Sequence, residues 1–479
     1  MYNIYQPIPM YSSTVTVPAN FVGVHWFGWP NYSTGNTPQP TNINYKSTYT
    51  WDWVGWGLSL NNWNLIETSV GTYNWTAIDT YMAAQGAAGK TVCYSSALMP
   101  SFYSQNPNTT GSPPPPAGPF GWAGPLTTTG SPSGLTALNT FITTVINRYI
   151  SKGTPIKVWQ AWQEPLFSGQ FTEANLPVTT SQGSPSTLLT MTNTTGIVAG
   201  MGIYHAKIPN GTYVVSLVAN TSVTISQASS SAVLTTDGNI RFSKAAEYWW
   251  GSAAQLVDMA NVTYTAVKAA DPTITVLSTS AEMPLPGVSS WWNTAGSTYP
   301  GVLGYQTCDQ YGIDCFGYWP TNFQMGFDPY QPTYLGDAVN PTYPNISGLI
   351  AAIKTQMGAN VKPIYVTSWG FSFVGTGPTS QAFRAYTPLQ RKQFIARSLL
   401  EFAANGVQAV IIYGGDSNTY LGGGNVQLWS GDFVNDTNGV IAGINEFAAN
   451  VPGKTILWAG VRGDGQMLAR FTDGSIYVV

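Results

Sequence analysis

The sequence predicts an α/β fold: a (β/α)₈ TIM barrel with an all-β insertion after the fourth strand and a small β extension at the C-terminus. Short apolar runs rich in β-branched and aromatic residues alternate with segments of helical periodicity along the 479 residues. Eight such runs occur, which is the number of strands that this barrel requires. Residues 178–242 have no helical period and are rich in Thr, Ser and Val, which indicates a separate β unit.

The elements follow one another along the chain in strand–helix order. The expected strands are Phe21–Trp29, Val54–Leu60, Thr91–Leu98, Ile156–Trp162, Ile274–Ser278, Ile313–Trp319, Pro363–Trp369 and Ala409–Tyr413. The expected helices are Thr76–Ala88, Leu135–Ile150, Ala245–Ala270, Ile346–Met357, Pro388–Asn405 and Gly439–Asn450. A Pro-, Gly- and Ser-rich stretch, Tyr103–Pro132, is expected to form an irregular loop after the third strand.

Three parts are expected from this order. The barrel takes residues 1–177 and 243–450, and the inserted β domain takes residues 178–242. Residues 451–479 contain short β-rich runs separated by Gly-Asp and Asp-Gly turns, and we expect them to pack on the barrel as strands.

Composition excludes several classes of protein. Only 8% of residues are charged, the net charge is −3 and no basic run occurs, which argues against nucleic-acid binding. The sequence contains no run of about 18 apolar residues, so no membrane span is predicted. Met1–Asn20 lacks the pattern of a cleavable leader. Cys308 and Cys315 could pair, but free buried thiols are the favoured interpretation of the three cysteines. With two histidines and no Cys cluster, neither a metal nor an organic cofactor is expected.

Aromatic residues are unusually abundant, at 13% with 18 Trp and 27 Tyr. Neutral aromatic surfaces suit neutral polar ligands, and sugars are the obvious class. For each ring, core packing is a near-equal interpretation, but as a group they favour a cleft because barrel interiors usually prefer Val, Ile and Leu. The aromatics expected at strand tips are Trp26, Trp29, Trp56, Tyr94, Trp162, Trp319, Trp369 and Tyr413.

The strongest local motif is Trp159–Pro165, which reads WQAWQEP. Glu164 follows the fourth predicted strand and would therefore stand at the C-terminal mouth of a barrel, where catalytic residues gather. Hydrophobic walls raise a carboxyl pKa, as a general acid needs at neutral pH. The alternative is a structural Glu at the start of a helix.

The motif resembles the "WEIWNEP" element of clan A retaining glycosidases, whose Glu is the acid/base. The order of the other pieces resembles glycoside hydrolase family 39. The first-strand motif "GVH" is similar to Gly23-Val24-His25. The family passage "W…E…G.YDW…D" is similar to the stretch that runs from Trp56 through Glu67 to Asp79. The family's "HYP" corresponds in position to Tyr318-Trp319-Pro320. The resemblance implies a barrel glycosidase with Glu164 as general acid.

Two positions depart from that family pattern. Gln163 replaces the Asn that usually holds the sugar 2-hydroxyl, and Ser368 stands where "KPIWVTEWG" has the nucleophilic Glu. A Ser hydroxyl without a neighbouring base cannot take over that role.

Three explanations compete for Ser368. The sequence carries an engineered Glu→Ser change, or the enzyme is natural with a relocated base, or the site binds sugar without cleaving it. For a relocated base, Glu282 after the fifth strand and Asp416 after the eighth are the candidates, with loop capping as their structural alternative. An inverting hydrolase would need its two carboxyls roughly 6.5–9.5 Å apart.

The β insertion resembles a module found in tailed-phage virion proteins. The similar stretches are Thr194–Met201, Ile208–Val215 and Val223–Ala228. The resemblance implies an extracellular or virion location, other tail proteins as partners and, as tail proteins often are, a homotrimer. A secreted bacterial enzyme with a β insert is the alternative.

Together these observations predict an endo-acting glycosidase of bacterial surface polysaccharide or exopolysaccharide. Glu164 would protonate the glycosidic oxygen, Glu282 or Asp416 would steer water, and the residues expected to hold the sugar are Gln163, Tyr318, Trp319 and Trp369. A non-catalytic receptor-binding tail protein is the main alternative, and a structural virion subunit is a third.

Overall fold

The computed structural model describes a little over half of the chain. The described residues are 8–11, 14–25, 49–51, 63–87, 89, 91–95, 99–104, 126–154, 156–162, 172–199, 201–205, 207–209, 212–244, 253–279, 281–282, 308–315, 320, 346–357, 361–370, 387–412, 439–462 and 466–479.

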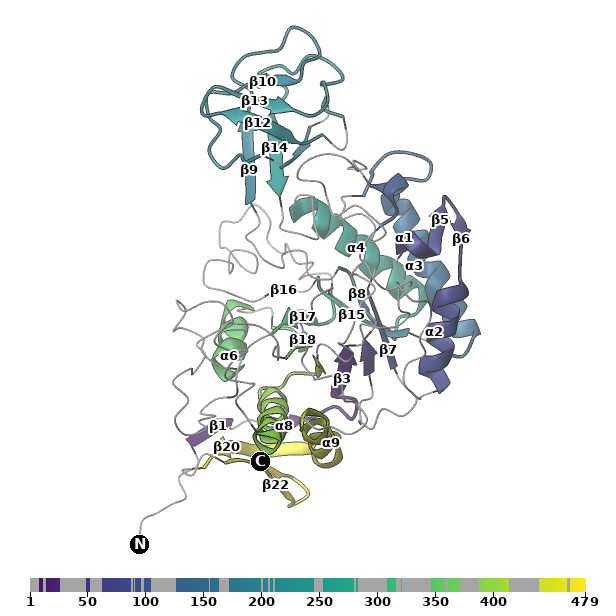
Figure 1. Cartoon of the computed structure of the whole chain (residues 1–479), viewed down its shortest axis with the longest axis vertical. Coiled ribbons are helices and arrows are strands. Elements are labelled where there is room, and N and C mark those ends of the chain that lie inside the picture. The colour runs from purple at the N-terminus through teal and green to yellow at the C-terminus, as the bar shows by residue number, and fades with distance from the viewer. Residues whose placement is uncertain are drawn as a thin grey trace.

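A parallel sheet forms the centre of the molecule (Figure 1). Its order is β15-β8-β7-β4-β3-β19-β18-β17-β16, and every neighbouring pair is parallel. The strands are β3 (Val22–His25), β4 (Tyr49–Trp51), β7 (Thr91–Ser95), β8 (Ile156–Gln160), β15 (Thr275–Leu277), β16 (Ala281–Glu282), β17 (Tyr311–Asp314), β18 (Ile364–Trp369) and β19 (Ala409–Ile412).

The two ends of this sheet are neighbours in the chain. β15 and β16 are separated by only three residues, and a parallel bridge joins Leu277 of β15 to Gln310, which directly precedes β17. The sheet therefore has the strand order of an α/β barrel in which β15 and β16 are two parts of one interrupted strand.

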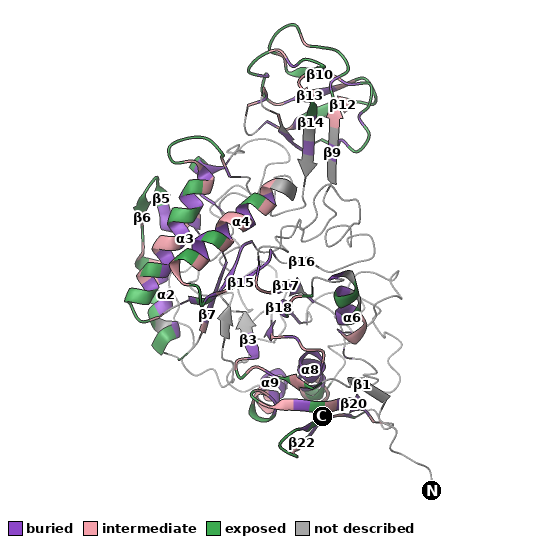
Figure 2. Cartoon of the chain, turned by 180° about the vertical axis from the view of Figure 1, so that it is seen from behind, coloured by how far each residue is buried: buried purple, intermediate pink, exposed green. Residues whose placement is uncertain are grey.

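Helices surround the sheet, as the views in Figures 1 and 2 agree. α2, α3 and α4 lie on one flank, α6 lies on the other, and α8 and α9 lie near the C-terminal strands. α2 and α3 turn buried residues toward the strands and exposed residues outward, whereas α8 is buried over most of its length. Their bounds are α1 (Trp63–Ile66), α2 (Thr76–Ala87), α3 (Gly134–Ser151), α4 (Ala253–Ala270), α6 (Ile346–Met357), α8 (Pro388–Ala404) and α9 (Val440–Asn450), with a 3₁₀ turn η1 (Ser101–Tyr103).

Local sequence signals explain where two of these helices begin. The Ser133 hydroxyl accepts a hydrogen bond from the Thr136 N–H and caps α3. At α8, Thr387 and Gln390 form a reciprocal capping box, with Pro388 in the first turn. Both arrangements satisfy N–H groups that a helix cannot satisfy internally.

The second and fifth strands differ from the sequence prediction. The second strand was expected at Val54–Leu60, but the strand between β3 and β7 is Tyr49–Trp51, and residues 54–60 lie outside the described residues. The fifth was expected to end at Ser278, yet pairing resumes at β16, so that Glu282 lies on a strand and not beyond one. Both missed strands are only two or three residues long, too short for a periodicity to be visible.

Six antiparallel strands lie between β8 and α4 and project from one end of the molecule (Figure 1). They form two sheets, β10-β13-β12 and β11-β14-β9, around a hydrophobic cluster of their own. The β segment begins at residue 172, somewhat before the expected residue 178, and the domain boundaries stay a prediction. The strands are β9 (Thr172–Pro177), β10 (Leu188–Thr190), β11 (Gly202–Tyr204), β12 (Val214–Val218), β13 (Ser222–Ile225) and β14 (Asn239–Lys244).

The strands expected near the C-terminus are present, and they pair with the start of the chain. β20 (Thr455–Val461), β21 (Met467–Phe471) and β22 (Ile476–Val478) form an antiparallel sheet. β1 (Ile8–Tyr11) and β2 (Val15–Thr16) both pair with β20. The turn before β22 is Asp473-Gly474, with Gly474 at φ 84°, a left-handed conformation that favours glycine.

Glu67 is a buried carboxylate that ties three segments together. It begins the small hairpin β5 (Glu67–Ser69) and β6 (Thr72–Tyr73), and only 1% of it is exposed. It accepts hydrogen bonds from Trp63 Nε1 at 2.7 Å, from the Tyr103 hydroxyl at 2.8 Å and from the Gly71 N–H at 2.9 Å. The Trp63 ring in turn stacks on Tyr103 and Phe141. Glu67 therefore connects α1, the hairpin and the turn η1.

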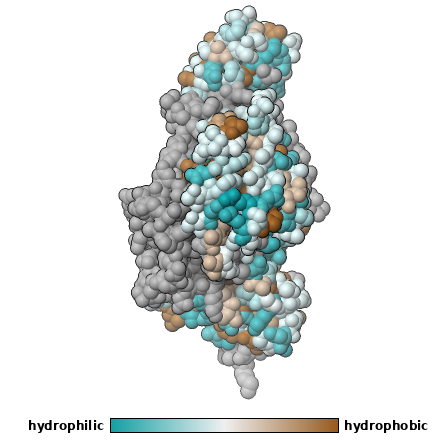
Figure 3. Space-filling model, turned by 90° about the vertical axis from the view of Figure 1, so that its right-hand side faces the viewer, coloured by the Kyte–Doolittle hydropathy of each residue, from teal (hydrophilic) through white to brown (hydrophobic). Residues whose placement is uncertain are grey.

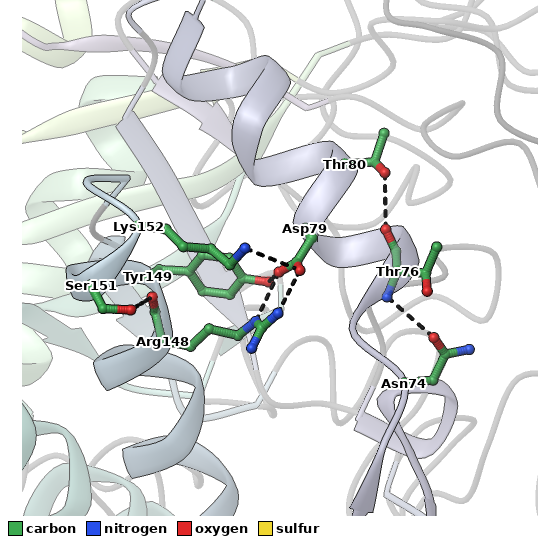
Figure 4. A network of polar contacts seen from close by, with 8 residues as sticks. All are labelled: Asn74, Thr76, Asp79, Thr80, Arg148, Tyr149, Ser151 and Lys152. Carbon is green, nitrogen blue, oxygen red and sulfur yellow. Dashed lines mark hydrogen bonds and ion pairs between the residues drawn. The ribbon is translucent and has the colours of Figure 1, made fainter.

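On the outer flank, Asp79 joins α2 to α3 (Figure 4). Arg148 donates two hydrogen bonds to the Asp79 carboxylate, at 2.8 and 2.5 Å, and the Tyr149 hydroxyl donates a third at 3.0 Å. Lys152 Nζ lies 3.3 Å from the same carboxylate, and the Arg148 guanidinium lies 4.7 Å from the centre of the Trp75 ring. Figure 3 shows this side of the molecule as mostly pale to teal, with hydrophobic residues scattered among its described atoms.

Asp79→Asn is expected to lower the free energy of unfolding at neutral pH by about 1–2 kcal/mol. The hydrogen bond from Arg148 lowers the pKa of Asp79 below its ordinary value, although burial opposes this shift. A lowered folded-state pKa stabilises the protein above the unfolded pKa of about 3.9, and the contribution disappears as the pH falls through the folded-state value. Urea unfolding of both proteins between pH 7 and pH 2 checks this. A difference that stays constant over the whole range would contradict it.

Two further properties concern the described residues only. No described helix combines the length and the apolar character needed to cross a membrane. Cys93, Cys308 and Cys315 are all buried and none of them forms a disulfide, which confirms the interpretation favoured from the sequence.

Candidate functional site

Backbone pairing aligns three polar residues at the carboxyl ends of adjacent parallel strands. Glu282 of β16 is the register partner of Asp314 of β17, and Asp314 is the register partner of Ser368 of β18. Neighbouring strands lie about 4.8 Å apart, so these positions form one short row across the end of the sheet. In parallel barrels this end carries the catalytic residues.

Relative to β17, β18 contains one extra residue between Val366 and Ser368. Relative to β17, the register runs from Ile313–Val366 to Asp314–Ser368, and the pairing with β19 also shifts between Val366 and Trp369. Such a bulge interrupts the alternation of side chains between the two faces of a strand. The extra residue is Thr367, which has no register partner on β17. Ser368 follows it with 2% of its surface exposed, and the Ser368 carbonyl accepts a hydrogen bond from the Cys315 N–H.

The bulge explains why Trp369 packs against a helix. Tyr365 faces the interior, because its hydroxyl lies 3.3 Å from the Cys93 sulfur on β7, a strand that is not its neighbour in the sheet. Regular alternation would then place Trp369 in the interior too. Instead it is fully buried against Phe394 and Phe402 of α8.

The interruption between β15 and β16 is bridged by polar contacts. The Gln160 amide of β8 donates from Nε2 to the Ser278 carbonyl at 3.3 Å, and the Ser278 hydroxyl accepts from the Gly312 N–H of β17 at 3.0 Å. A Cβ at Gly312 would come 2.8 Å from Gln160 Nε2 and 3.2 Å from Thr367 Cγ2, so the absent side chain leaves room for the Gln160 amide. These contacts replace ladder hydrogen bonds where the fifth strand is broken.

Three of the predicted aromatic platforms are core residues in the structure. Tyr94 and Trp162 are 1% exposed, and the Tyr94 ring contacts Trp159 with ring centres 4.5 Å apart. Trp369 packs on α8 as described above. Their expected role as stacking surfaces for sugar rings is therefore replaced by core packing, the alternative that the sequence also allowed.

The other predicted site residues divide into two groups. Glu282 and Ser368 are brought to the same end of the sheet, on the two strands that flank β17. The remaining ones lie outside the described residues, and they are Glu164, Gln163, Asp416, Trp26, Trp29, Trp56, Tyr318, Trp319 and Tyr413. Trp162, the last described residue after β8, precedes Glu164 by two positions.

Asp314 is a candidate that sequence reasoning missed. It lies in the run IDCFGYW, which was interpreted only as the sixth strand. A single acidic residue within an otherwise apolar and aromatic strand was the available signal, because a charge on a buried strand needs a partner or a function.

Other reactive groups in the described interior do not form a second centre. Burial raises the pKa of the Cys93 thiol, with the Tyr365 hydroxyl acting in the opposite direction, so the thiol stays protonated at neutral pH. Among the described residues, no group of three or more His, Cys, Asp and Glu side chains is arranged to hold a metal ion.

The chain was also compared with known proteins. No family model matches the sequence, and no curated protein matches it. Similar solved structures include a glucosidase from Croceicoccus marinus, at 12% identity and a TM-score of 0.47 over 99% of this chain and 76% of that one. A GH10 protein from Paenibacillus barcinonensis has 11% identity and a TM-score of 0.44 over 91% and 96% of the two chains.

A third similar structure is a GH39 β-xylosidase from Caulobacter crescentus, at 12% identity and a TM-score of 0.43 over 97% of this chain and 79% of that one. The similar structures named here are thus glycoside hydrolases. At TM-scores below 0.5 they add nothing to what strand pairing shows about the fold, and membership of family 39 stays a prediction.

Proposed function

We propose that the chain is an endo-acting glycoside hydrolase of bacterial surface polysaccharide, built on a complete (β/α)₈ barrel with a β insertion. The register that aligns Glu282, Asp314 and Ser368 at the carboxyl ends of adjacent strands is the observation that carries the proposal. It supplies two acidic residues at the end of the sheet where barrel enzymes perform their chemistry. The sequence motif that ends in Glu164 follows β8 and would reach the same end.

In this proposal Glu164 is the general acid that protonates the glycosidic oxygen. A second carboxylate steers the attacking water, and Asp314 joins Glu282 and Asp416 as a candidate for it. Because Ser368 replaces the carboxylate that would attack the sugar directly, we propose inversion at the anomeric carbon. Inversion requires the acid and the base to stand roughly 6.5–9.5 Å apart with a water between them.

The substrate class follows from composition. A protein with 8% charged residues and 13% aromatic residues suits a neutral, hydroxyl-rich polymer better than an acidic one. The resemblance of the β segment to phage modules supports an extracellular or virion location, with other tail proteins as partners and a homotrimer as the assembly.

Reducing-end release from a panel of bacterial exopolysaccharides tests the proposal. We expect at least one neutral polysaccharide to be cut to oligosaccharides, and proton NMR of the first products to show the anomer opposite to that of the substrate. Products that keep the substrate's configuration would contradict the inverting mechanism. Absence of release from every neutral glycan in the panel would contradict the hydrolase itself.

A non-catalytic receptor-binding protein is the second candidate, and the presence of Ser368 favours it. A barrel that lost its attacking carboxylate could keep its affinity for sugar without cleaving it. Binding of a polysaccharide that is never shortened, with unchanged affinity in Glu164→Gln, would support this candidate over the hydrolase.

A further inference from the structure

A layer of polar side chains lies inside the barrel where aliphatic residues are usual. Ser95 of β7, Gln160 of β8 and Thr367 of β18 are completely buried. Each has one polar side-chain atom without a hydrogen-bond partner among the described residues, namely Ser95 Oγ, Gln160 Oε1 and Thr367 Oγ1.

All three belong to the interior face of the sheet. Ser95 lies two residues after Cys93, whose contact with Tyr365 crosses the interior, and Ser95 is the register partner of Gln160. Gly312 is the register partner of Tyr365, so the space over Gly312 lies on the interior face. The Gln160 amide and the Thr367 methyl group both adjoin this space, which places Thr367 on the interior face although the bulge begins at that residue.

Buried polar atoms in folded proteins almost always have partners, because leaving one unpaired costs free energy. Gln160 Oε1 can only accept hydrogen bonds, whereas the hydroxyls of Ser95 and Thr367 can donate and accept. A ligand that bonds to all three atoms must therefore donate to Gln160 Oε1, and it can either donate to or accept from the two hydroxyls. Water meets these conditions, and internal water typically makes about three hydrogen bonds to such groups.

We propose that Ser95, Gln160 and Thr367 form a binding site for ordered water in the barrel interior. The row that contains Asp314 and Ser368 begins one position after Thr367 on β18 and two positions after Gly312 on β17. The site thus lies directly beneath that row. In the proposed hydrolase the attacking water is needed at the row, and the water site leads toward that position. This last step rests on the proposed function, whereas the water site itself does not.

A high-resolution crystal structure of the full chain tests the site directly. We expect water density within hydrogen-bond distance of at least two of the three oxygens. A dry interior, or a protein side chain that bonds to these atoms, would overturn the proposal.

Serine variants give a matched thermodynamic test. Ser398 on α8 is also completely buried, but its hydroxyl donates to the Phe394 carbonyl at 2.8 Å. If water bonds to Ser95, then Ser95→Ala should lower the melting temperature about as much as Ser398→Ala does. An unchanged or higher melting temperature for Ser95→Ala would mean that its hydroxyl has no partner, and the site would be wrong. Thr367→Val, which keeps the shape of the side chain, should repeat the loss seen for Ser95→Ala.

Kinetics on a cleaved polysaccharide test the link to hydrolysis. Ser95→Ala and Thr367→Val should lower kcat with little change in KM, whereas Ser398→Ala should change neither. Unchanged kcat in both interior variants would overturn the link to hydrolysis. The water site itself would still be decided by the electron density of the crystal structure. If the wild-type protein cleaves no glycan, the proposed function fails, and the crystal structure still decides the water site.

Discussion

Glu164→Gln is expected to reduce release of reducing ends by about 100- to 10,000-fold, the usual contribution of a general acid. The amide is close in size to the carboxylic acid but has no proton to give to the departing sugar oxygen. Polysaccharide affinity should remain, because neutral stacking and hydrogen bonding do not depend on that proton. Initial rates at saturating substrate, with affinity measured separately by calorimetry, distinguish the two effects.

Glu446→Gln is the matched control for this experiment. Glu446 is a half-buried residue of α9 that forms an ion pair with Lys392 and contacts the Tyr477 hydroxyl. The same chemical change there should leave the rate unaltered. Equal rates for wild-type protein and Glu164→Gln would remove Glu164 from the mechanism.

The largest effect on stability is expected for Glu67→Ala. The substitution leaves the Trp63 indole N–H, the Tyr103 hydroxyl and the Gly71 N–H without their acceptor. Trp63 and Tyr103 are buried, whereas Gly71 is exposed to water. Each buried donor that loses its partner costs about 1–3 kcal/mol, so a loss of about 2–6 kcal/mol is expected. Denaturant unfolding measures it directly.

Two milder variants keep this prediction testable if Glu67→Ala does not fold. Glu67→Gln retains one acceptor oxygen and should lose less stability than Glu67→Ala. Tyr103→Phe removes one donor together with its need for a partner, so its loss should be the smallest of the three. The prediction would be contradicted if Tyr103→Phe destabilised the protein as much as Glu67→Gln.

The strands that sequence predicted well are those with long apolar runs. Pro363–Trp369 and Ala409–Tyr413 were expected within one residue of the observed β18 and β19. Tyr49–Trp51 and Ala281–Glu282 were missed because they are short, and only pairing with their neighbours makes them strands. Their stability comes from tertiary context, which a local pattern does not contain.

The candidate site could be predicted only in part for a similar reason. Glu282 and Ser368 were identified as residues near strand ends, but nothing local shows that Asp314 joins them, since register depends on the whole sheet. Trp369 was assigned to sugar because the sequence cannot reveal a bulge of one residue. That bulge decides whether an indole faces the interior or α8.

The pairing of β1 and β2 with β20 has a consequence for biosynthesis. Residues 8–16 leave the ribosome early, yet their hydrogen-bonding partners at 455–461 emerge only after the described strands of the central parallel sheet have been synthesised. The amino-terminal segment must therefore wait with open backbone groups while the rest of the polypeptide is translated. During this interval the open edges of β1 and β2 are exposed to pairing with other chains, and nascent chains would rely on chaperone protection of those edges until β20 forms.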